Sequence, residues 1–217
     1  MKRVLITGSA GRIGTVLSQG LPYSVTGLDL PEHDIADYPM LAERCRGQDA
    51  VIHLAGEFAT ENYRSGEINP QNFRLDLNAL RAAREAGVPR VVLASSVHAD
   101  DFRNAPRPVS VDRPNPVPTS PYGAHKLFVE GLGRHYAAHQ GLEVVAIRFG
   151  GVNADDVPGT LGLDPLLYLS HVDLLGCVRA AVEAPLPPSR FVAVYAVSDR
   201  AGELHDTANP LGWRPGA

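Results

Sequence analysis

The sequence predicts an α/β fold, a doubly wound parallel sheet with helices on both faces and a small C-terminal substrate-binding portion. Three observations point to it. Short apolar runs alternate with helical stretches along nearly the whole chain, glycine or polar residues follow the apolar runs, and a glycine-rich turn follows the first of them. Alternating strands and helices form parallel sheets covered on both faces. Such sheets bind ligands at the carboxyl ends of their strands.

The composition is that of an ordinary globular chain, which we expect to form one domain over residues 1–217. The chain has 217 residues, of which 44% are hydrophobic and 20% charged, and its net charge is −4. Without a basic patch, nucleic acid is not the expected partner. No apolar run reaches the ~20 residues of a membrane span, and no secretory signal precedes the first strand. Cys45 and Cys177 lack metal-binding spacing, which fits a reducing cytoplasm.

The first strand and the turn after it predict a dinucleotide site of the Rossmann type. Residues 3–6 are an apolar run, and the turn Thr7-Gly8-Ser9-Ala10-Gly11-Arg12-Ile13-Gly14 leads into a predicted helix over 15–21. Gly8 permits the tight turn, Gly11 lets the backbone approach a pyrophosphate, and Gly14 lets helix and strand pack closely. The helix N-terminus offers free N–H groups to phosphates. Arg12 and Ile13 belong to the same cofactor-binding turn.

The second predicted strand, residues 25–28, ends in an acid that favours NAD. Asp29 follows it, about 20 residues beyond the first glycine, where a carboxylate can bond the ribose 2′-hydroxyl. The same carboxylate would repel the 2′-phosphate of NADP. NADP stays open as an alternative, because the guanidinium of Arg12 in the turn could help to hold that phosphate.

The middle of the chain continues the alternation. We expect a helix over 38–46, a buried strand over 50–55 ending in Gly56, a polar loop over 57–70, a helix over 71–86 and a strand over 90–94. Leu75, Leu80 and Ala83 have helical spacing, and Gly87 is placed to end that helix. The last of these strands runs into Ser95 and Ser96.

The second half begins with a proline-rich stretch that we interpret as an ordered active-site loop, because the alternation resumes after it. A helix over 122–139, a strand over 143–147, a mainly helical segment over 167–184 and a strand over 190–197 follow. The strand ends bring Gly8, Asp29, Gly56, Ser96 and Gly150 to one edge of the sheet.

Tyr122 and Lys126 lie four residues apart at the start of the predicted helix over 122–139. Residues at this spacing share a helix face, so the phenol and the ammonium point the same way. A cation beside a phenol favours the phenolate. Such a tyrosine can move a proton to or from an alcohol or a carbonyl.

Together these motifs resemble the extended short-chain dehydrogenase/reductase family, the NAD-dependent epimerases and dehydratases. The resemblance covers nearly the whole chain and rests on Thr7–Gly14, Asp34-Ile35, Leu54-Ala55-Gly56, Asn72, Ala94-Ser95-Ser96, Tyr122 with Lys126, and Ile147-Arg148. It implies a catalytic triad of Ser96, Tyr122 and Lys126, with Lys126 also bonding the nicotinamide ribose. It also implies cofactor contacts from Asp34, Ile35, Leu54, Ala55, Gly56 and Asn72. A homodimer formed by the helices near 72–86 and 122–139 is implied too.

Within that family the chain is most similar to uronate dehydrogenases, which oxidise the anomeric carbon of a hexuronate to a lactone with NAD. The similar runs are Ala94-Ser95-Ser96-Val97-His98, Leu169-Ser170-His171-Val172-Asp173 and Leu211-Gly212-Trp213-Arg214-Pro215. Val97 and Gly151 replace the asparagine and serine with which those enzymes hold the sugar carboxylate. Between Arg148 and Arg179 the chain has no Arg or Lys, but it has Asp155, Asp156 and Asp164.

The departures predict an uncharged sugar or a polyol-like alcohol as substrate, because a carboxylate would lose a charged hydrogen bond worth roughly 1.5–3 kcal/mol. The candidate substrate residues are Ser96, Val97, His98, Tyr122 and Gly151, within segments 97–121 and 150–217. His98 has two alternatives, a contact with substrate or a role in the loop.

Other readings of the same residues are weaker. We expect His125 to be solvated and His53 to be a satisfied strand residue. Ser96, His98 and Asp100 are not expected to form a hydrolase triad, because no Gly-x-Ser-x-Gly elbow is present. A nucleotide-sugar epimerase or dehydratase needs a larger C-terminal region, and a dehydratase needs a carboxylate where Val97 stands. A non-catalytic NAD sensor would not need the intact triad.

Overall fold

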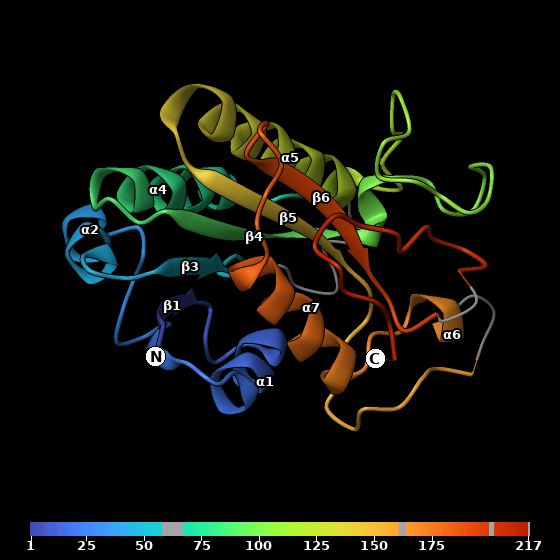
Figure 1. Ribbon diagram of the computed structural model, residues 1–217, viewed down its shortest axis with the longest axis horizontal. Coiled ribbons are helices and arrows are strands. Elements are labelled where there is room, and N and C mark those ends of the chain that lie inside the picture. Colours follow the sequence, from blue (N-terminus) through green and yellow to red (C-terminus); the bar gives the residue numbers. More distant parts are fainter. Residues whose placement is uncertain (58–66, 161–163, 200–201, 217) are drawn as a thin grey trace.

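The computed structural model describes residues 1–57, 67–160, 164–199 and 202–216. Its centre is a six-stranded parallel sheet in the order β2-β1-β3-β4-β5-β6 (Figure 1). The strands are β1 (Arg3–Thr7), β2 (Ser24–Leu28), β3 (Ala50–His53), β4 (Arg90–Ser96), β5 (Glu143–Phe149) and β6 (Phe191–Ala196). The predicted α/β fold is confirmed. Most of the polar loop predicted over 57–70 lies outside the described residues.

Helices cover both faces of the sheet. On one face lie α1 (Arg12–Gly20) and α7 (His171–Glu183), and on the other lie α2 (Tyr38–Cys45), α4 (Gln71–Glu85) and α5 (Pro121–Gln140) (Figure 1). Along β1, Val4 and Ile6 belong to the first core and Leu5 to the second, as alternation along a strand requires. Both faces are buried, so the strands are continuous apolar runs in the sequence.

Local capping explains where the helices begin. The side chains of Asp37, Ser120 and Ser170 accept hydrogen bonds from backbone N–H groups in the first turns of α2, α5 and α7. After α4, Gly87 has a φ of +73°, the left-handed conformation that glycine adopts readily. The predicted end of that helix is therefore confirmed.

Two predicted boundaries are wrong in informative ways. The strand predicted over 90–94 continues to Ser96, because β5 pairs with it through Ser96↔Phe149. The segment predicted as mainly helical over 167–184 is helical from His171 onward, in α7, whereas the short helix α6 (Asp164–Leu167) ends where the predicted segment begins. Between them the backbone pairs with Gly151 instead: the Gly151 N–H donates to the Leu167 carbonyl, and the Leu169 N–H donates to the Gly151 carbonyl.

A third apolar cluster lies beyond the sheet and joins the proline-rich loop to the C-terminal tail. It consists of Val97, Phe102, Ala105, Val109, Tyr195, Val197 and Leu204. An isolated bridge between Val109 and His205 ties the two segments together. The loop begins with a short 3-10 helix, η1 (Val97–Ala99). The proline-rich stretch is therefore packed and ordered, as predicted.

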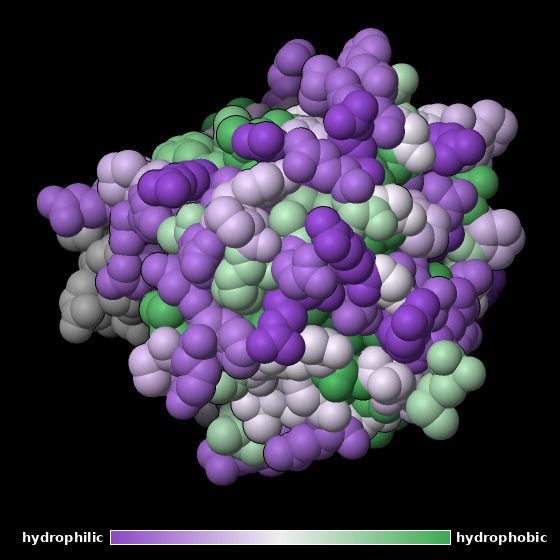
Figure 2. All heavy atoms as spheres, turned by 90° about the vertical axis from the view of Figure 1, so that its left-hand side faces the viewer, coloured by the Kyte–Doolittle hydropathy of each residue, from purple (hydrophilic) through white to green (hydrophobic). Residues whose placement is uncertain are grey.

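In the part of the chain that the structure describes, no helix has the length and apolarity of a membrane span. The face drawn in Figure 2 carries mainly hydrophilic side chains, with hydrophobic ones in small groups.

Candidate active site

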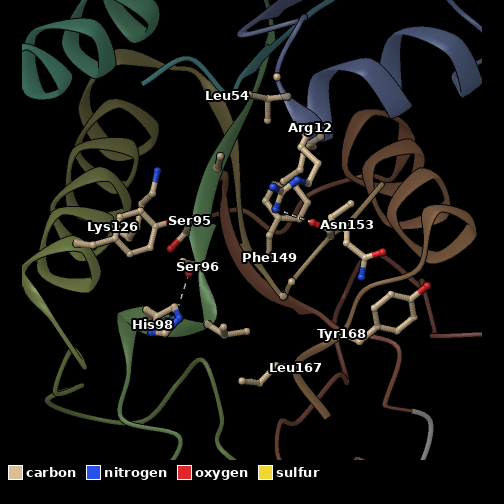
Figure 3. Close-up of a pocket in the computed structure, with 18 of the residues that line it drawn as sticks. Arg12, Leu54, Ser95, Ser96, His98, Lys126, Phe149, Asn153, Leu167 and Tyr168 are labelled. Atoms are coloured by element: carbon tan, nitrogen blue, oxygen red, sulfur yellow. Dashed lines mark hydrogen bonds between the residues drawn. The ribbon is translucent and has the colours of Figure 1, made fainter. Parts of the chain in front are cut away.

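A cavity of about 650 Å³ opens at the carboxyl edge of the sheet, between the glycine-rich turn, the ends of β4 and β5, the start of α5 and the segment before α7 (Figure 3). It brings together many of the predicted site residues, which are Gly8, Gly11, Arg12, Ile13, Gly14, Leu54, Ser96, Val97, His98, Tyr122, Lys126 and Gly151. Of the five residues expected together at the strand ends, Gly8, Ser96 and Gly150 line the cavity, whereas Asp29 and Gly56 do not.

The glycine-rich turn is packed backbone against backbone. Gly8 has a φ of +73°, and a Cβ there would lie 2.7 Å from the Ala55 nitrogen. A Cβ on Gly14 would lie 2.2 Å from the Gly8 carbonyl oxygen. The first turn of α1 has neither a side-chain cap nor an acidic residue, and the nearby Asp29 carboxylate accepts from the Ala10 N–H, just before the helix. This arrangement fits the pyrophosphate of a dinucleotide.

Six predicted cofactor residues are not among those that line the cavity. Asp29 accepts hydrogen bonds from the Ala10 N–H at 2.7 Å and the Leu30 N–H at 2.8 Å. The Asn72 side chain makes two hydrogen bonds with the backbone of Glu57. It accepts from the N–H at 2.9 Å and donates to the carbonyl at 3.0 Å. The others are Asp34, which accepts from the Ala36 N–H, buried Ile35, Ala55 beside Gly8, and Gly56. Their contacts with a cofactor stay predictions.

Ser96, Tyr122 and Lys126 meet at one wall of the cavity. Ser96 ends β4, whereas Tyr122 and Lys126 come from the first turns of α5. The ammonium of Lys126 lies 5.5 Å from the centre of the Tyr122 ring, and the lysine is 5% exposed. A Cβ on Gly123 would lie 2.0 Å from the His98 carbonyl oxygen, so α5 begins in direct contact with η1. This contact brings the tyrosine beside the serine.

His98 lines the cavity and is also tied to the loop, so its contact with substrate stays a prediction. Its ring lines the cavity, and its Nδ1 lies 2.7 Å from the Thr119 hydroxyl, which ties it to the loop. Burial, and then the charge of Arg103, hold the pKa of His98 below its ordinary value. The imidazole is therefore neutral near pH 7.

The prediction for His125 is wrong. Its side chain is 1% exposed, and its Nε2 lies 2.8 Å from Asp76 Oδ2 on α4. The face of α5 that turns away from the Tyr–Lys pair packs against α4 instead of solvent. His53 is a satisfied strand residue, as predicted, with contacts to Thr7 and Asp76.

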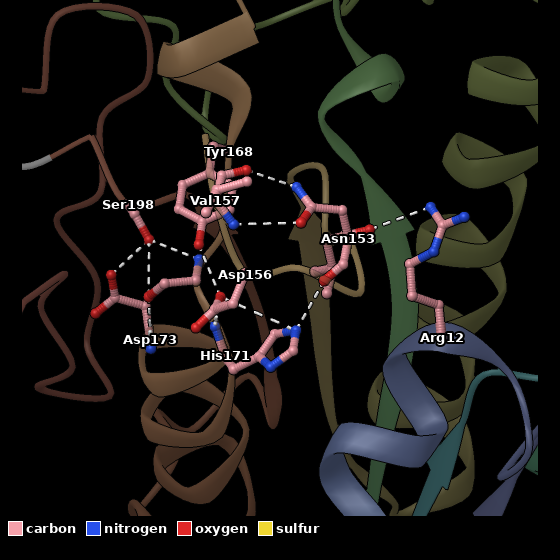
Figure 4. Close-up of polar contacts among 10 residues, drawn as sticks. Arg12, Asn153, Asp156, Val157, Tyr168, His171, Asp173 and Ser198 are labelled. Atoms are coloured by element: carbon pink, nitrogen blue, oxygen red, sulfur yellow. Dashed lines mark hydrogen bonds and ion pairs between the residues drawn. The ribbon is translucent and has the colours of Figure 1, made fainter. Parts of the chain in front are cut away.

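The far wall of the cavity includes Asp164, one of the three aspartates noted in the sequence, and three residues that the sequence did not single out, Asn153, Leu167 and Tyr168. Asn153 closes a short loop by bonding the backbone of Val157 in both directions. Asp156 accepts from the Tyr168 hydroxyl and the His171 N–H, both at 2.7 Å (Figure 4). The only signal in the sequence was the cluster of aspartates after Gly151.

The charges in the cavity are divided unevenly. Among the described lining residues, the fully charged side chains are Arg12, Lys126 and Asp164. Arg12 donates to the Val152 carbonyl at 3.1 Å, which joins the glycine-rich turn to the far loop. The far wall therefore offers a substrate one carboxylate, and the described part of it offers no Arg or Lys.

Comparisons with known proteins place this geometry in context. The sequence profile of the NAD dependent epimerase/dehydratase family matches residues 4–154. An L-arabinose 1-dehydrogenase (NAD(P)(+)) of Haloferax volcanii is 33% identical over 99% of this chain and 96% of its own length. A uronate dehydrogenase of Agrobacterium fabrum is 27% identical over 99% of this chain and 84% of its own length.

Solved structures show the same architecture. A glucuronic acid dehydrogenase from Chromohalobacter salexigens is 26% identical and superposes with a TM-score of 0.81, covering 100% of this chain and 85% of its own. A mutant uronate dehydrogenase from Agrobacterium tumefaciens, complexed with NAD, is 25% identical with a TM-score of 0.79, again covering 100% and 85%.

Proposed function

Because the chain belongs to the NAD-dependent epimerase/dehydratase family, we propose that it is a sugar 1-dehydrogenase that oxidises the anomeric carbon of a neutral aldose to a lactone. The family, the NAD cofactor and the oxidoreductase class that the sequence predicted are confirmed by the matches. The sugar's neutrality rests on one observation, the cavity wall that presents Asp164 without an Arg or Lys among its described residues.

The proton-transfer steps follow from the cavity wall. Tyr122, as phenolate, takes the proton of the C1 hydroxyl, and Ser96 donates a hydrogen bond to that oxygen as the C=O bond forms. Lys126 stabilises the phenolate through its charge, 5.5 Å from the ring centre. Bound NAD supplies the acceptor for the hydride that leaves C1. The glycine-rich turn holds the dinucleotide through backbone N–H groups.

The relatives divide by substrate in a way that supports a neutral sugar. The L-arabinose dehydrogenase is named for a neutral aldopentose, and the uronate dehydrogenases are named for a sugar acid. A sugar carboxylate at the far wall would meet Asp164 and no Arg or Lys among that wall's described residues, because the two cations of the lining, Arg12 and Lys126, come from the glycine-rich turn and α5. Losing a charged hydrogen bond costs roughly 1.5–3 kcal/mol, about tenfold or more in affinity.

We also propose a cytoplasmic homodimer. Phe73 and Leu77 on α4 and Phe128 on α5 are 36%, 44% and 41% exposed, and the two phenylalanine rings lie 4.9 Å apart. A second copy of the same face would bury them. The buried free thiols of Cys45 and Cys177 fit a reducing compartment. Phe128→Glu should convert the dimer to a monomer in sedimentation; an unchanged mass would refute this interface.

The test of the function is NADH formation from NAD across L-arabinose, other neutral aldoses, glucuronate and galacturonate. We expect turnover on a neutral aldose and little on the uronates. Turnover confined to uronates would overturn the substrate class. NAD binding without turnover on any sugar would favour the alternative of an NAD sensor, and interconversion of nucleotide sugars would favour the epimerase.

A further inference from the structure

A chain of buried hydrogen bonds runs beneath the cavity and joins four elements. The Thr7 hydroxyl, at the end of β1, lies 2.8 Å from His53 Nδ1 on β3. His53 Nε2 lies 3.1 Å from one carboxylate oxygen of Asp76 on α4, and His125 Nε2 on α5 lies 2.8 Å from the other. Each of these side chains is at most 5% exposed. None of these contacts was predicted from the sequence, and the proposed chemistry does not use them.

The hydrogen bonds among these side chains can be assigned a donor and an acceptor each. Burial raises the pKa of Asp76, but hydrogen bonds from His125 and His53 outweigh burial and hold that pKa well below its ordinary range. An ionised carboxylate only accepts hydrogen bonds, so both histidines donate through Nε2–H. In the neutral form of His53, Nδ1 then accepts from the Thr7 hydroxyl, whose oxygen in turn accepts from the Ala55 N–H at 3.3 Å.

The two ends of this hydrogen-bond chain, Thr7 and His125, lie next to the two parts of the site that would hold a dinucleotide. Thr7 immediately precedes Gly8, and Ala55 is the residue against which Gly8 packs. At the other end, His125 immediately precedes Lys126, whose charge also lowers the pKa of Asp76. The edge of the His125 ring packs against Phe73 on α4, with ring centres 4.8 Å apart. One carboxylate therefore ties the glycine-rich turn to the helix of the proton-transfer pair.

We propose that Asp76 is a positioning residue: by holding His53 and His125 together, it fixes the rotation of α5 and the spacing between Lys126 and the glycine-rich turn. This inference rests on the proposed function, because it assigns Lys126 to the bound dinucleotide. It predicts that Asp76 acts on cofactor binding through Lys126, and does not merely stabilise the fold.

Asp76→Asn tests the carboxylate with little change of shape. An amide accepts from only one of the two histidines through its oxygen, so one imidazole must change its tautomer. We expect Asp76→Asn to weaken NADH binding about tenfold relative to the wild type. In a Lys126→Ala background, the same substitution should change the affinity for NADH by no more than about twofold, because the effects of coupled sites are not additive. Arg81→Ala is the matched control on the same helix, where the lost hydrogen bond goes to the Glu85 carboxylate. It should lower stability and leave NADH binding unchanged.

A second pair keeps the test independent of how well the Asp76 variant folds. His125→Gln retains an N–H donor toward Asp76, whereas His125→Phe retains the ring against Phe73 but loses the donor. The glutamine variant should bind NADH as the wild type does, and the phenylalanine variant should resemble Asp76→Asn. Imidazole nitrogen NMR should show both histidines protonated at Nε2 in the wild type, with one of them changed in Asp76→Asn.

The outcomes separate this inference from the proposed function. If the wild type binds NADH but oxidises no sugar, the dehydrogenase proposal fails and the binding cycle still decides the role of Asp76. Equal NADH affinity in all Asp76 and His125 variants, or additive losses with Lys126→Ala, would overturn the positioning role. A wild type that binds no dinucleotide would overturn both.

Discussion

The two walls of the cavity are built by different means. One wall, which we assign to the cofactor and call the cofactor wall, consists of regular elements and the turn that joins two of them. These are the turn between β1 and α1, the end of β4, and the first turns of α5. The far wall, which we assign to the substrate and call the substrate wall, consists of the segments around Asn153 and Tyr168. Hydrogen bonds between side chains and backbone hold these segments. Chemistry that recurs on this fold needs fixed geometry, whereas loops can change to suit a substrate without disturbing the sheet.

The largest effect should come from the wall that carries the chemistry. Tyr122→Phe removes the group that takes the proton, so we expect kcat to fall about 10²–10⁴-fold. The dissociation constant of NADH should change by less than about twofold, because the ring and Lys126 remain. Steady-state kinetics and NADH titration measure both. Retained turnover would mean that the cofactor wall does not carry the proton transfer.

The second prediction concerns the free energy of unfolding at low pH and the part that His205 plays in it. Burial lowers the pKa of His205 to about 4, and neither ring nitrogen has a partner among the described residues. The unfolded residue has a pKa near 6.5. His205 therefore costs no stability above pH 6.5, and the free energy of unfolding falls by up to about 3 kcal/mol as pH drops toward 4.

His205→Phe should remove this dependence while keeping the contact with the Tyr195 ring, 4.5 Å away. Urea unfolding at several pH values measures it, with exposed His135→Gln as the control. Identical slopes for wild type and His205→Phe between pH 4 and 6.5 would show that the buried histidine does not set the acid sensitivity.

The third prediction tests how closely the glycine-rich turn is packed. Gly8→Ala places a Cβ 2.7 Å from the Ala55 nitrogen at a φ of +73°, so we expect a loss of about 1–3 kcal/mol in stability. NADH should bind at least several-fold more weakly, because the turn must shift. Gly131→Ala, on the exposed side of α5 with open space around it, should stabilise the protein by about 0.5–1 kcal/mol. Equal behaviour of the two variants would contradict the fit of the turn.

The smallest effect should come from the substrate wall. Tyr168→Phe removes the hydrogen bond to Asp156, worth about 1 kcal/mol, and loosens the loop beside the sugar. We expect the KM for the sugar to rise about fivefold, with kcat and NADH affinity nearly unchanged. Tyr38→Phe, which loses a similar hydroxyl contact with Glu85 far from the cavity, is the control. A fall in kcat would show that the two walls are not separable.

The contrast between the walls also explains what the sequence could predict. The glycine-rich turn and the Tyr122–Lys126 pair are local patterns, in which spacing alone determines which groups lie together. His125 was misjudged because its partner Asp76 lies 49 residues away in the chain, and only the packing of α5 on α4 brings them together. The described segments around Asn153 and Tyr168 depend on side-chain hydrogen bonds, many to backbone, that leave no periodic signal in the sequence.

The most direct test of the account is hydride transfer from a neutral sugar labelled with deuterium at its anomeric carbon. L-arabinose labelled in this way should yield, with NAD, the corresponding lactone and reduced cofactor that carries the deuterium, and Tyr122→Phe should yield neither. Reduced cofactor without deuterium, or no reduced cofactor from any neutral aldose while a uronate reacts briskly, would contradict the account.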